Sequence, residues 1–182
     1  MFRWLQRKAW LRRTGRQLYE RIVAQARAEV FYRDLGVADT IEGHFEMIVL
    51  HMVLVLRRLK READLGQRLG QIVMEHLIAD MDDALRQIGI GDMGVPRRVQ
   101  RAAAAFEERS RDYAAAVQSG DVTQAVLRHV YGAPEAPTPE MSRCAERLAQ
   151  YVRASAIELD GAARDAILQG PLPFAAITST RI

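Results

Sequence analysis

The sequence predicts an all-α protein, a single-domain bundle of about six helices around a fully apolar central helix over about 43–62. Apolar residues recur at helical spacing in several long segments, and no segment shows the sustained alternation of a β-strand. The six prolines lie outside every periodic segment, as helix interiors require. A chain of 182 residues with 49% hydrophobic and 27% charged residues has the composition of a globular protein rather than a disordered one.

The N-terminal half predicts three helices. A helix over about 17–30 carries an apolar stripe on one face, and a turn at 34–36 ends it. Asp39 fits the N-cap of the next helix, because Glu42 follows three residues later as in a capping box. That helix is apolar on nearly all sides, which is typical of the centre of a bundle. A helix over about 64–88 follows it.

The C-terminal half predicts three more helices. Pro96 fits the first turn of a helix over about 95–118, and Asp121 opens a short one. Thr138 and Pro139 begin a last helix that runs to about residue 168, with a break near Gly161. The expected division is a basic segment 1–16, a helical domain 17–131, a proline-rich linker 132–139, a C-terminal helix 140–169 and a loose tail 170–182.

The charge of the chain is concentrated at its start. Lys and Arg total 26 against 23 Asp and Glu, and six of these cations but no acid lie in residues 1–16, so the rest of the chain carries a net charge of −3. A body of that sign is a poor DNA-binding protein. The single cysteine, Cys144, excludes an intramolecular disulfide and a cysteine-built zinc site.

The first residues combine tryptophan with arginine and lysine, which is the composition of a helix that lies on a membrane surface. We expect this segment to face an anionic membrane or a ribosome, and the alternative is a solvated tail. No apolar stretch reaches the length of a membrane span or of a signal peptide core, so we expect a cytoplasmic protein, peripheral on the inner membrane. The residues expected at the surface of the membrane are Arg3, Trp4, Arg7, Lys8, Trp10, Arg12 and Arg13.

Motifs for catalysis and cofactors are missing or out of context. Residues 89–94 match GxGxxG, but the match follows a helix instead of a strand, so it predicts a turn. His76, Asp80 and Asp83 share one helix face and could hold a metal, which leaves a small helical metalloprotein or enzyme as the alternative function. His44 and His51 also share a face, so a haem or metal role is one interpretation, and hydrogen-bonded core or boundary histidines are the simpler one.

Two charged groups are candidates for a partner-binding surface. One is basic and ends the central helix, where cations favour the negative helix terminus. The other is the acidic group on the following helix. The candidate residues are Arg57, Arg58, Arg61, Asp80, Asp82 and Asp83.

Several motifs, matched in order and spacing, resemble the ubiquinol–cytochrome c chaperone family, the assembly factors of the respiratory cytochrome bc1 complex. The resemblance covers about residues 17–131 and rests on residues 19–27, 31–37, 44–51, 54–59, 80–82, 85–86 and 89–93. It implies a non-enzymatic chaperone without a cofactor that binds cytochrome b or another bc1 subunit. Mitochondrial members of the family act with a small partner protein near the ribosome exit. We expect this chain to be a bacterial form with the chaperone domain alone.

Overall fold

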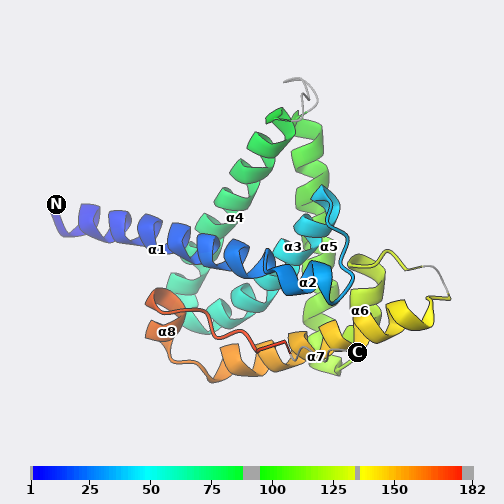
Figure 1. Ribbon diagram of the computed structural model, residues 1–182. Coiled ribbons are helices and arrows are strands. Elements are labelled where there is room, and N and C mark those ends of the chain that lie inside the picture. Colours follow the sequence, from blue (N-terminus) through cyan, green and yellow to red (C-terminus); the bar gives the residue numbers. More distant parts are fainter. Residues whose placement is uncertain (1, 88–94, 134–135, 178–182) are drawn as a thin grey trace.

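The computed structural model describes residues 2–87, 95–133 and 136–177, and in these ranges the chain forms helices joined by loops, without a strand (Figure 1). The all-α prediction is therefore confirmed. The helices are α1 (Phe2–Ala26), α2 (Glu29–Arg33), α3 (Ile41–Leu59), α4 (Ala63–Gln87), α5 (Val95–Ser119), α6 (Val122–His129), α7 (Pro139–Gly161) and α8 (Arg164–Gln169), with a short 3-10 helix, η1 (Lys60–Glu62), between α3 and α4.

Helix α3 lies at the centre, in contact with α1, α4, α5 and α7. Its position was predicted, but the prediction that it is fully apolar is wrong. Glu46, His51 and Arg58 are all buried on it, each less than 8% exposed. The helix also begins at Ile41 and gives way to η1 after Leu59.

The N-cap of α3 is Thr40, not Asp39 as the sequence suggested. The Thr40 hydroxyl accepts a hydrogen bond from the backbone N–H of Gly43 at 3.1 Å. Asp39 instead lies 2.7 Å from the Nε2 of His44. Serine, threonine, aspartate and asparagine all serve as N-caps, so the capping-box pattern at Asp39 does not by itself exclude the neighbouring Thr40.

Helix α1 is longer than predicted, because it continues without a break from Phe2 through Gln17. Its second half crosses α4, where a Cβ placed on Gly15 would lie only 2.5 Å from the Cγ2 of Ile72. Leu11 and Thr14 are buried at this crossing. The first turns of α1 extend beyond the body of the protein (Figure 1).

Helices α4 and α5 meet at one end and diverge towards the rest of the molecule (Figure 1). Their described parts agree with the predicted helices at about 64–88 and 95–118. The glycine-rich turn predicted at 89–94 lies outside the described residues.

The N-caps of α6 and α7 were both predicted, and one of them is confirmed. The hydroxyl of Thr138 accepts from the N–H of Met141 at 3.2 Å and so caps α7. The side chain of Asp121 makes no capping hydrogen bond to α6.

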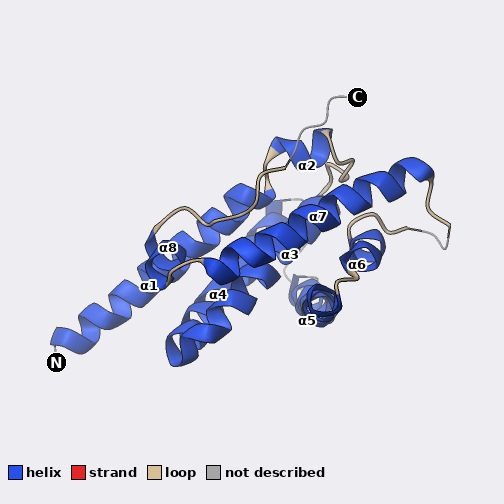
Figure 2. Cartoon of the chain, turned by 90° about the horizontal axis from the view of Figure 1, so that it is seen from below, coloured by secondary structure: helices blue, strands red, loops and turns tan. Residues whose placement is uncertain are grey.

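The C-terminal half ends in a packed segment. Residues 170–177, expected to be loose, run back alongside α7 (Figure 2). The N–H of Ala175 donates to the hydroxyl of Ser155 at 3.1 Å, and the ring of Phe174 packs against the core.

The close crossing of α1 and α4 predicts that Gly15→Ala destabilises the protein. The added methyl group overlaps Ile72, and overpacking of this kind costs about 1–3 kcal/mol, which outweighs the gain of about 1 kcal/mol from replacing glycine in a helix. Thermal unfolding followed by circular dichroism measures the change. Gly161→Ala is the matched control, because a Cβ at Gly161 meets no atom within 4 Å. A melting temperature that rises in both variants would contradict the tight crossing.

Candidate functional site

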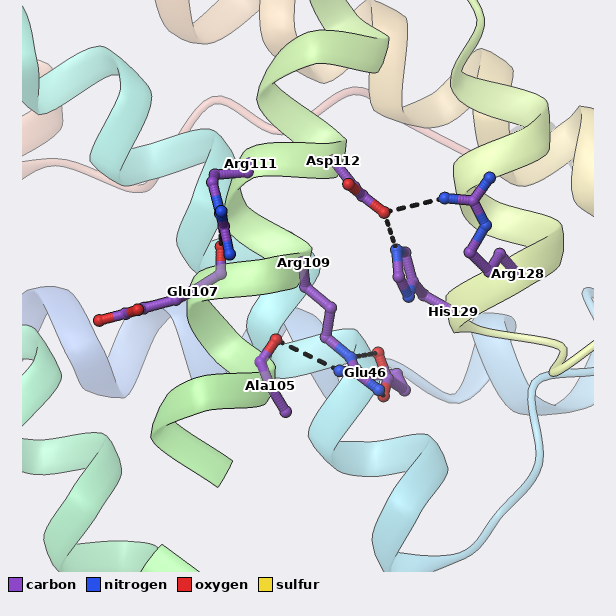
Figure 3. A network of polar contacts seen from close by, with 8 residues as sticks. All are labelled: Glu46, Ala105, Glu107, Arg109, Arg111, Asp112, Arg128 and His129. Atoms are coloured by element: carbon purple, nitrogen blue, oxygen red, sulfur yellow. Dashed lines mark hydrogen bonds and ion pairs between the residues drawn. The ribbon is translucent and has the colours of Figure 1, made fainter. Parts of the chain in front are cut away.

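The polar interior of the bundle includes an ion pair between α3 and α5 (Figure 3). The Nε of Arg109 donates to both carboxylate oxygens of Glu46 at 2.7 Å, and a second guanidinium nitrogen lies 2.6 Å from Glu46 Oε1. Arg109 also donates to the backbone carbonyl of Ala105 at 3.2 Å. The hydrogen bond to Glu46 raises the pKa of Arg109. This pair satisfies the buried carboxylate and connects the two helices.

A second polar group connects α5 to α6 (Figure 3). One carboxylate oxygen of Asp112 lies 2.8 Å from the Nε2 of His129 and accepts from Arg128 at 3.0 Å. The hydrogen bond with His129 lowers the pKa of Asp112. The ring of His129 also packs against that of the buried Tyr113. Both sets of contacts hold helices together.

His51 is fully buried and hydrogen-bonded at both ring nitrogens. Its Nδ1 lies 2.7 Å from the carbonyl oxygen of Met47, and its Nε2 lies 2.7 Å from the hydroxyl of Tyr151 on α7. A carbonyl only accepts, so Nδ1 carries the proton and Nε2 accepts from Tyr151. Burial lowers the pKa of His51 to about 4, so the ring is neutral near pH 7. His51 is therefore a hydrogen-bonded core histidine, as the simpler interpretation of the sequence predicted.

His44 has separate partners, although it shares a helix face with His51. It interacts with Asp39, and its ring lies 4.8 Å from that of Tyr32. Around His51, aromatic rings from α2 and the C-terminal segment complete the packing, with Phe31 at 5.2 Å and Phe174 at 5.0 Å between ring centroids. The two histidines do not converge on one site.

The three predicted partner-binding arginines contact the end of α7 or the loop that follows it. Arg57 and Arg61 bind one carboxylate oxygen of Asp160 at 2.9 Å and 3.1 Å. Arg58 pairs with Glu62 at 2.7 Å and donates to the carbonyl of Ala162. Their use by a partner stays a prediction. Arg61 is the most accessible of the three, with 54% of its side chain exposed.

The acidic candidates lie on the second half of α4. The carboxylate of Asp80 accepts a hydrogen bond from Tyr19 of α1 at 2.8 Å, and the ring of His76 stacks on that of Tyr19 at 5.8 Å. Burial and Asp80 together raise the pKa of Tyr19. Asp83 is exposed and Asp82 is half-buried. Within the described residues, no three His, Cys, Asp or Glu side chains lie close enough together to hold a metal ion.

The projecting turns of α1 form what we call the basic arm, residues 3–9. Trp4 and Leu5 on it are 62% and 52% exposed. The ammonium group of Lys8 lies 5.4 Å from the centroid of the Trp4 ring. Farther along the helix, Trp10 packs partly against the core. The remaining predicted surface cations, Arg3, Arg7, Arg12 and Arg13, are all exposed.

An apolar groove of about 530 Å³ runs along the first half of α4. We call it the α4 groove. Its lining includes Leu56 of α3 and Met74 of α4, together with Gly66 and Gly70. The sequence analysis did not identify it, because its lining comes from three consecutive elements whose relative positions depend on the turn at η1. Its lining residues are Leu56, Lys60, Ala63, Asp64, Gly66, Gln67, Gly70, Gln71 and Met74.

Comparisons with known proteins agree on one family. A family model described as "Ubiquinol-cytochrome C chaperone" matches residues 33–174. A crystal structure of the Cbp3 homolog from Brucella abortus is 30% identical in sequence and superimposes with a TM-score of 0.82 over 98% of each chain. No curated protein sequence matches the chain.

The buried His51 predicts a loss of stability in acid. Its pKa is about 4 in the folded protein against 6.5 for an ordinary histidine, so protons bind the unfolded chain first as the pH falls below 6.5. At pH 4.5, this difference removes about 2–3 kcal/mol of the free energy of unfolding. In His51→Gln that part of the loss should be absent. Urea unfolding at pH 4.5 to 8 measures the free energy of unfolding of both proteins. If this free energy fell equally steeply with pH below 6.5 in the wild type and in His51→Gln, the result would contradict a neutral, buried His51.

Proposed function

The chain belongs to the ubiquinol–cytochrome C chaperone family, and we propose that it is an assembly chaperone of ubiquinol–cytochrome c reductase, the bc1 complex. In this proposal it binds cytochrome b or another subunit of the complex and catalyses no reaction. The observation that carries the proposal is the family match over residues 33–174, supported by a related structure that covers 98% of the chain.

The alternative of a metalloprotein or enzyme based on His76, Asp80 and Asp83 has less support. Tyr19 packs between His76 and Asp80, because it stacks on the ring of the first and donates to the carboxylate of the second. Its hydroxyl therefore already engages one of the two carboxylate oxygens of Asp80. The contacts at these residues favour a role in joining α1 to α4 and in forming an acidic surface.

The acidic surface of α4, formed by Asp80, Asp82 and Asp83, supports a partner-binding role. Asp83 is exposed and lies about one turn from the described end of α4 at Gln87. A carboxylate near this end of a helix is opposed by the helix dipole, at a cost of about 0.3–1 kcal/mol. Asp83 is therefore better explained by binding a partner than by stabilising the fold, whereas Asp80 already accepts a hydrogen bond from Tyr19.

The basic arm supports a second contact, with an anionic membrane surface. Its cations are exposed, and each contributes about 1 kcal/mol when it lies near anionic headgroups. The exposed Trp4 ring suits the headgroup region, where the aromatic body and the polar N–H both find partners. This contact would hold the chaperone on the cytoplasmic face of the inner membrane, beside a client that is being inserted. Among the described residues, no helix has both the length and the hydropathy to cross a bilayer.

The arginines at the end of α3 have a smaller part in this proposal. Arg57 and Arg58 are engaged with the end of α7 and are partly or fully buried. Arg61 is the one that a partner reaches most easily. We therefore place Arg57 and Arg58 beneath a partner surface, where they keep α7 in position, and Arg61 at its edge.

Charge reversal at Asp83 should lower bc1 assembly without lowering stability. In Asp83→Lys the new cation is favoured by the helix dipole, so the melting temperature should stay equal or rise slightly. The assay is a strain that lacks this chain and is complemented with each variant, with the bc1 complex quantified from the haem spectrum of its membranes. We expect the variant to assemble less than half of the wild-type amount, roughly the effect of a 1 kcal/mol loss in partner binding.

The matched control is Glu107→Lys, which makes the same charge change at an exposed position of α5 (Figure 3). It should leave assembly unchanged. Equal losses of assembly in both variants would remove the acidic surface from the proposal. Unchanged bc1 content in the strain that lacks the chain would contradict the proposed function itself.

Reversing the charges of the basic arm should release the protein from anionic membranes. Truncation at residue 17 would remove the buried Leu11 and Thr14 and so damage the core, but Arg3→Glu with Arg7→Glu changes only exposed positions. Co-sedimentation with vesicles of 30% phosphatidylglycerol, about the anionic content that such binding needs, should fall at least about tenfold. Added salt should weaken the binding of the wild-type protein to these vesicles, because salt screens exposed charges beyond about 8 Å.

Vesicles of neutral phosphatidylcholine alone are the control for this experiment, and neither protein should sediment strongly with them. Equal binding of the wild type and the double variant to anionic vesicles would contradict the membrane contact. The basic arm would then be assigned to a ribosome or a protein.

A further inference from the structure

The α4 groove lies on the face of α4 that points away from α1. Helix α1 crosses α4 at Ile72 and reaches Asp80, whereas the groove follows positions 63, 66, 67, 70, 71 and 74. These positions recur every three or four residues, so they form one stripe about three turns long. The stretch from position 63 to position 74 spans about 16 Å of helix, which matches the length of a short helical segment laid along it.

Two of the residues that line the groove are glycines, for two different reasons. Gly66 is required by the fold, because a Cβ there would overlap the carbonyl oxygen of Leu59. Gly70 is not required in this way. A Cβ at Gly70 would approach only the Cδ2 of Leu56, at 3.2 Å, and that flexible methyl group can move. A glycine in the middle of a helix costs about 1 kcal/mol relative to alanine, so Gly70 lowers stability while it keeps the groove open.

The charges around the groove indicate what kind of partner it can bind. Lys60 and Asp64 on its edge have opposite charges, and Gln67 and Gln71 are neutral. The groove therefore has no net charge and does not complement the cation-rich basic arm of a second copy of this chain. It fits an uncharged helix with small or aliphatic side chains, because the glycines that line it let two helix backbones approach closely. Uncharged apolar helices are the chemistry of membrane-spanning segments.

On these grounds the structure assigns the α4 groove as the docking site for one uncharged, apolar helical segment of the client. This inference rests on the proposed function, since it takes the client to be a membrane subunit of the bc1 complex. It differs from the charged contacts above in both place and chemistry. Binding there should be insensitive to salt, whereas the acidic surface of α4 and the basic arm depend on charge.

The experiment is photo-crosslinking in the complemented strain, with the full chain and cytochrome b as the detected partner. A benzophenone-bearing amino acid replaces Gln71 on the groove, and in a separate protein it replaces the exposed Gln118 of α5 as a control. We expect cytochrome b to be captured from Gln71 and not from Gln118. Gly70→Leu, which fills the groove, should lower this capture about tenfold.

Ala115→Leu adds a leucine at an exposed position of α5 and should not change the capture. If Gly70→Leu fails to fold, Gln67→Glu decides the question, because it places a charge on the groove at an exposed position and should also lower the capture. Capture that neither variant lowers, or that is equal from Gln71 and Gln118, would overturn the groove assignment and leave the proposed function intact. Capture of a second copy of this chain from Gln71 would also overturn it.

The two hypotheses fail separately. A strain that lacks this chain and still assembles the bc1 complex would contradict the proposed function. A strain in which assembly depends on the chain, but in which Gln71 captures no cytochrome b, would contradict only the groove assignment.

Discussion

The burial of α3 is the constraint on which the rest of the structure depends. Where α3 is enclosed by four other helices, its polar side chains lose contact with water, so each buried one needs a partner within the protein. Glu46 pairs with Arg109 of α5, His51 with Tyr151 of α7, and Arg58 with Glu62 and the loop after α7. The polar side chains of α3 therefore specify which helices lie beside it, and the apolar contacts supply most of the stability.

This constraint explains which parts of the fold could be predicted from the sequence. Apolar periodicity and prolines predicted the six longer helices, the central place of α3 and the Thr138 cap, but not the short α2 as a helix of its own. They predicted a basic helix at the N-terminus and a separate helix from about residue 17, but not that the two are one, because the burial of Leu11 and the close approach of Gly15 to α4 arise only in the folded protein. The C-terminal segment was missed for a similar reason, since Phe174 and its neighbours show no periodicity and are ordered only by contact with α3 and α7.

The candidate site was predictable only where it is formed by one element. The acidic residues of α4 and the cations of α1 are runs along a single helix, and the sequence alone showed both. Glu46 within an apolar stretch was also a usable signal, because a carboxylate there needs a cationic partner, but nothing in the sequence pointed to Arg109, 63 positions away. The α4 groove depends on how η1 turns the chain between α3 and α4, and Ala63 at that turn has a backbone φ of +48°, which side chains seldom adopt.

The charged ends of three helices suggest what this fold was selected for. The first turn of α1 holds Arg3 and no acid, the first turn of α5 holds Arg97 and no acid, and Asp82 and Asp83 lie near the end of α4. Each placement opposes the helix dipole, which favours acids at the start of a helix and cations at its end. The interior of the protein instead pairs its buried charges, as the Glu46–Arg109 and Arg58–Glu62 pairs show. Buried charges are thus paired in the core, whereas the helix ends that project from it carry charges that the dipole disfavours, which is the pattern expected when projecting ends are kept for binding partners.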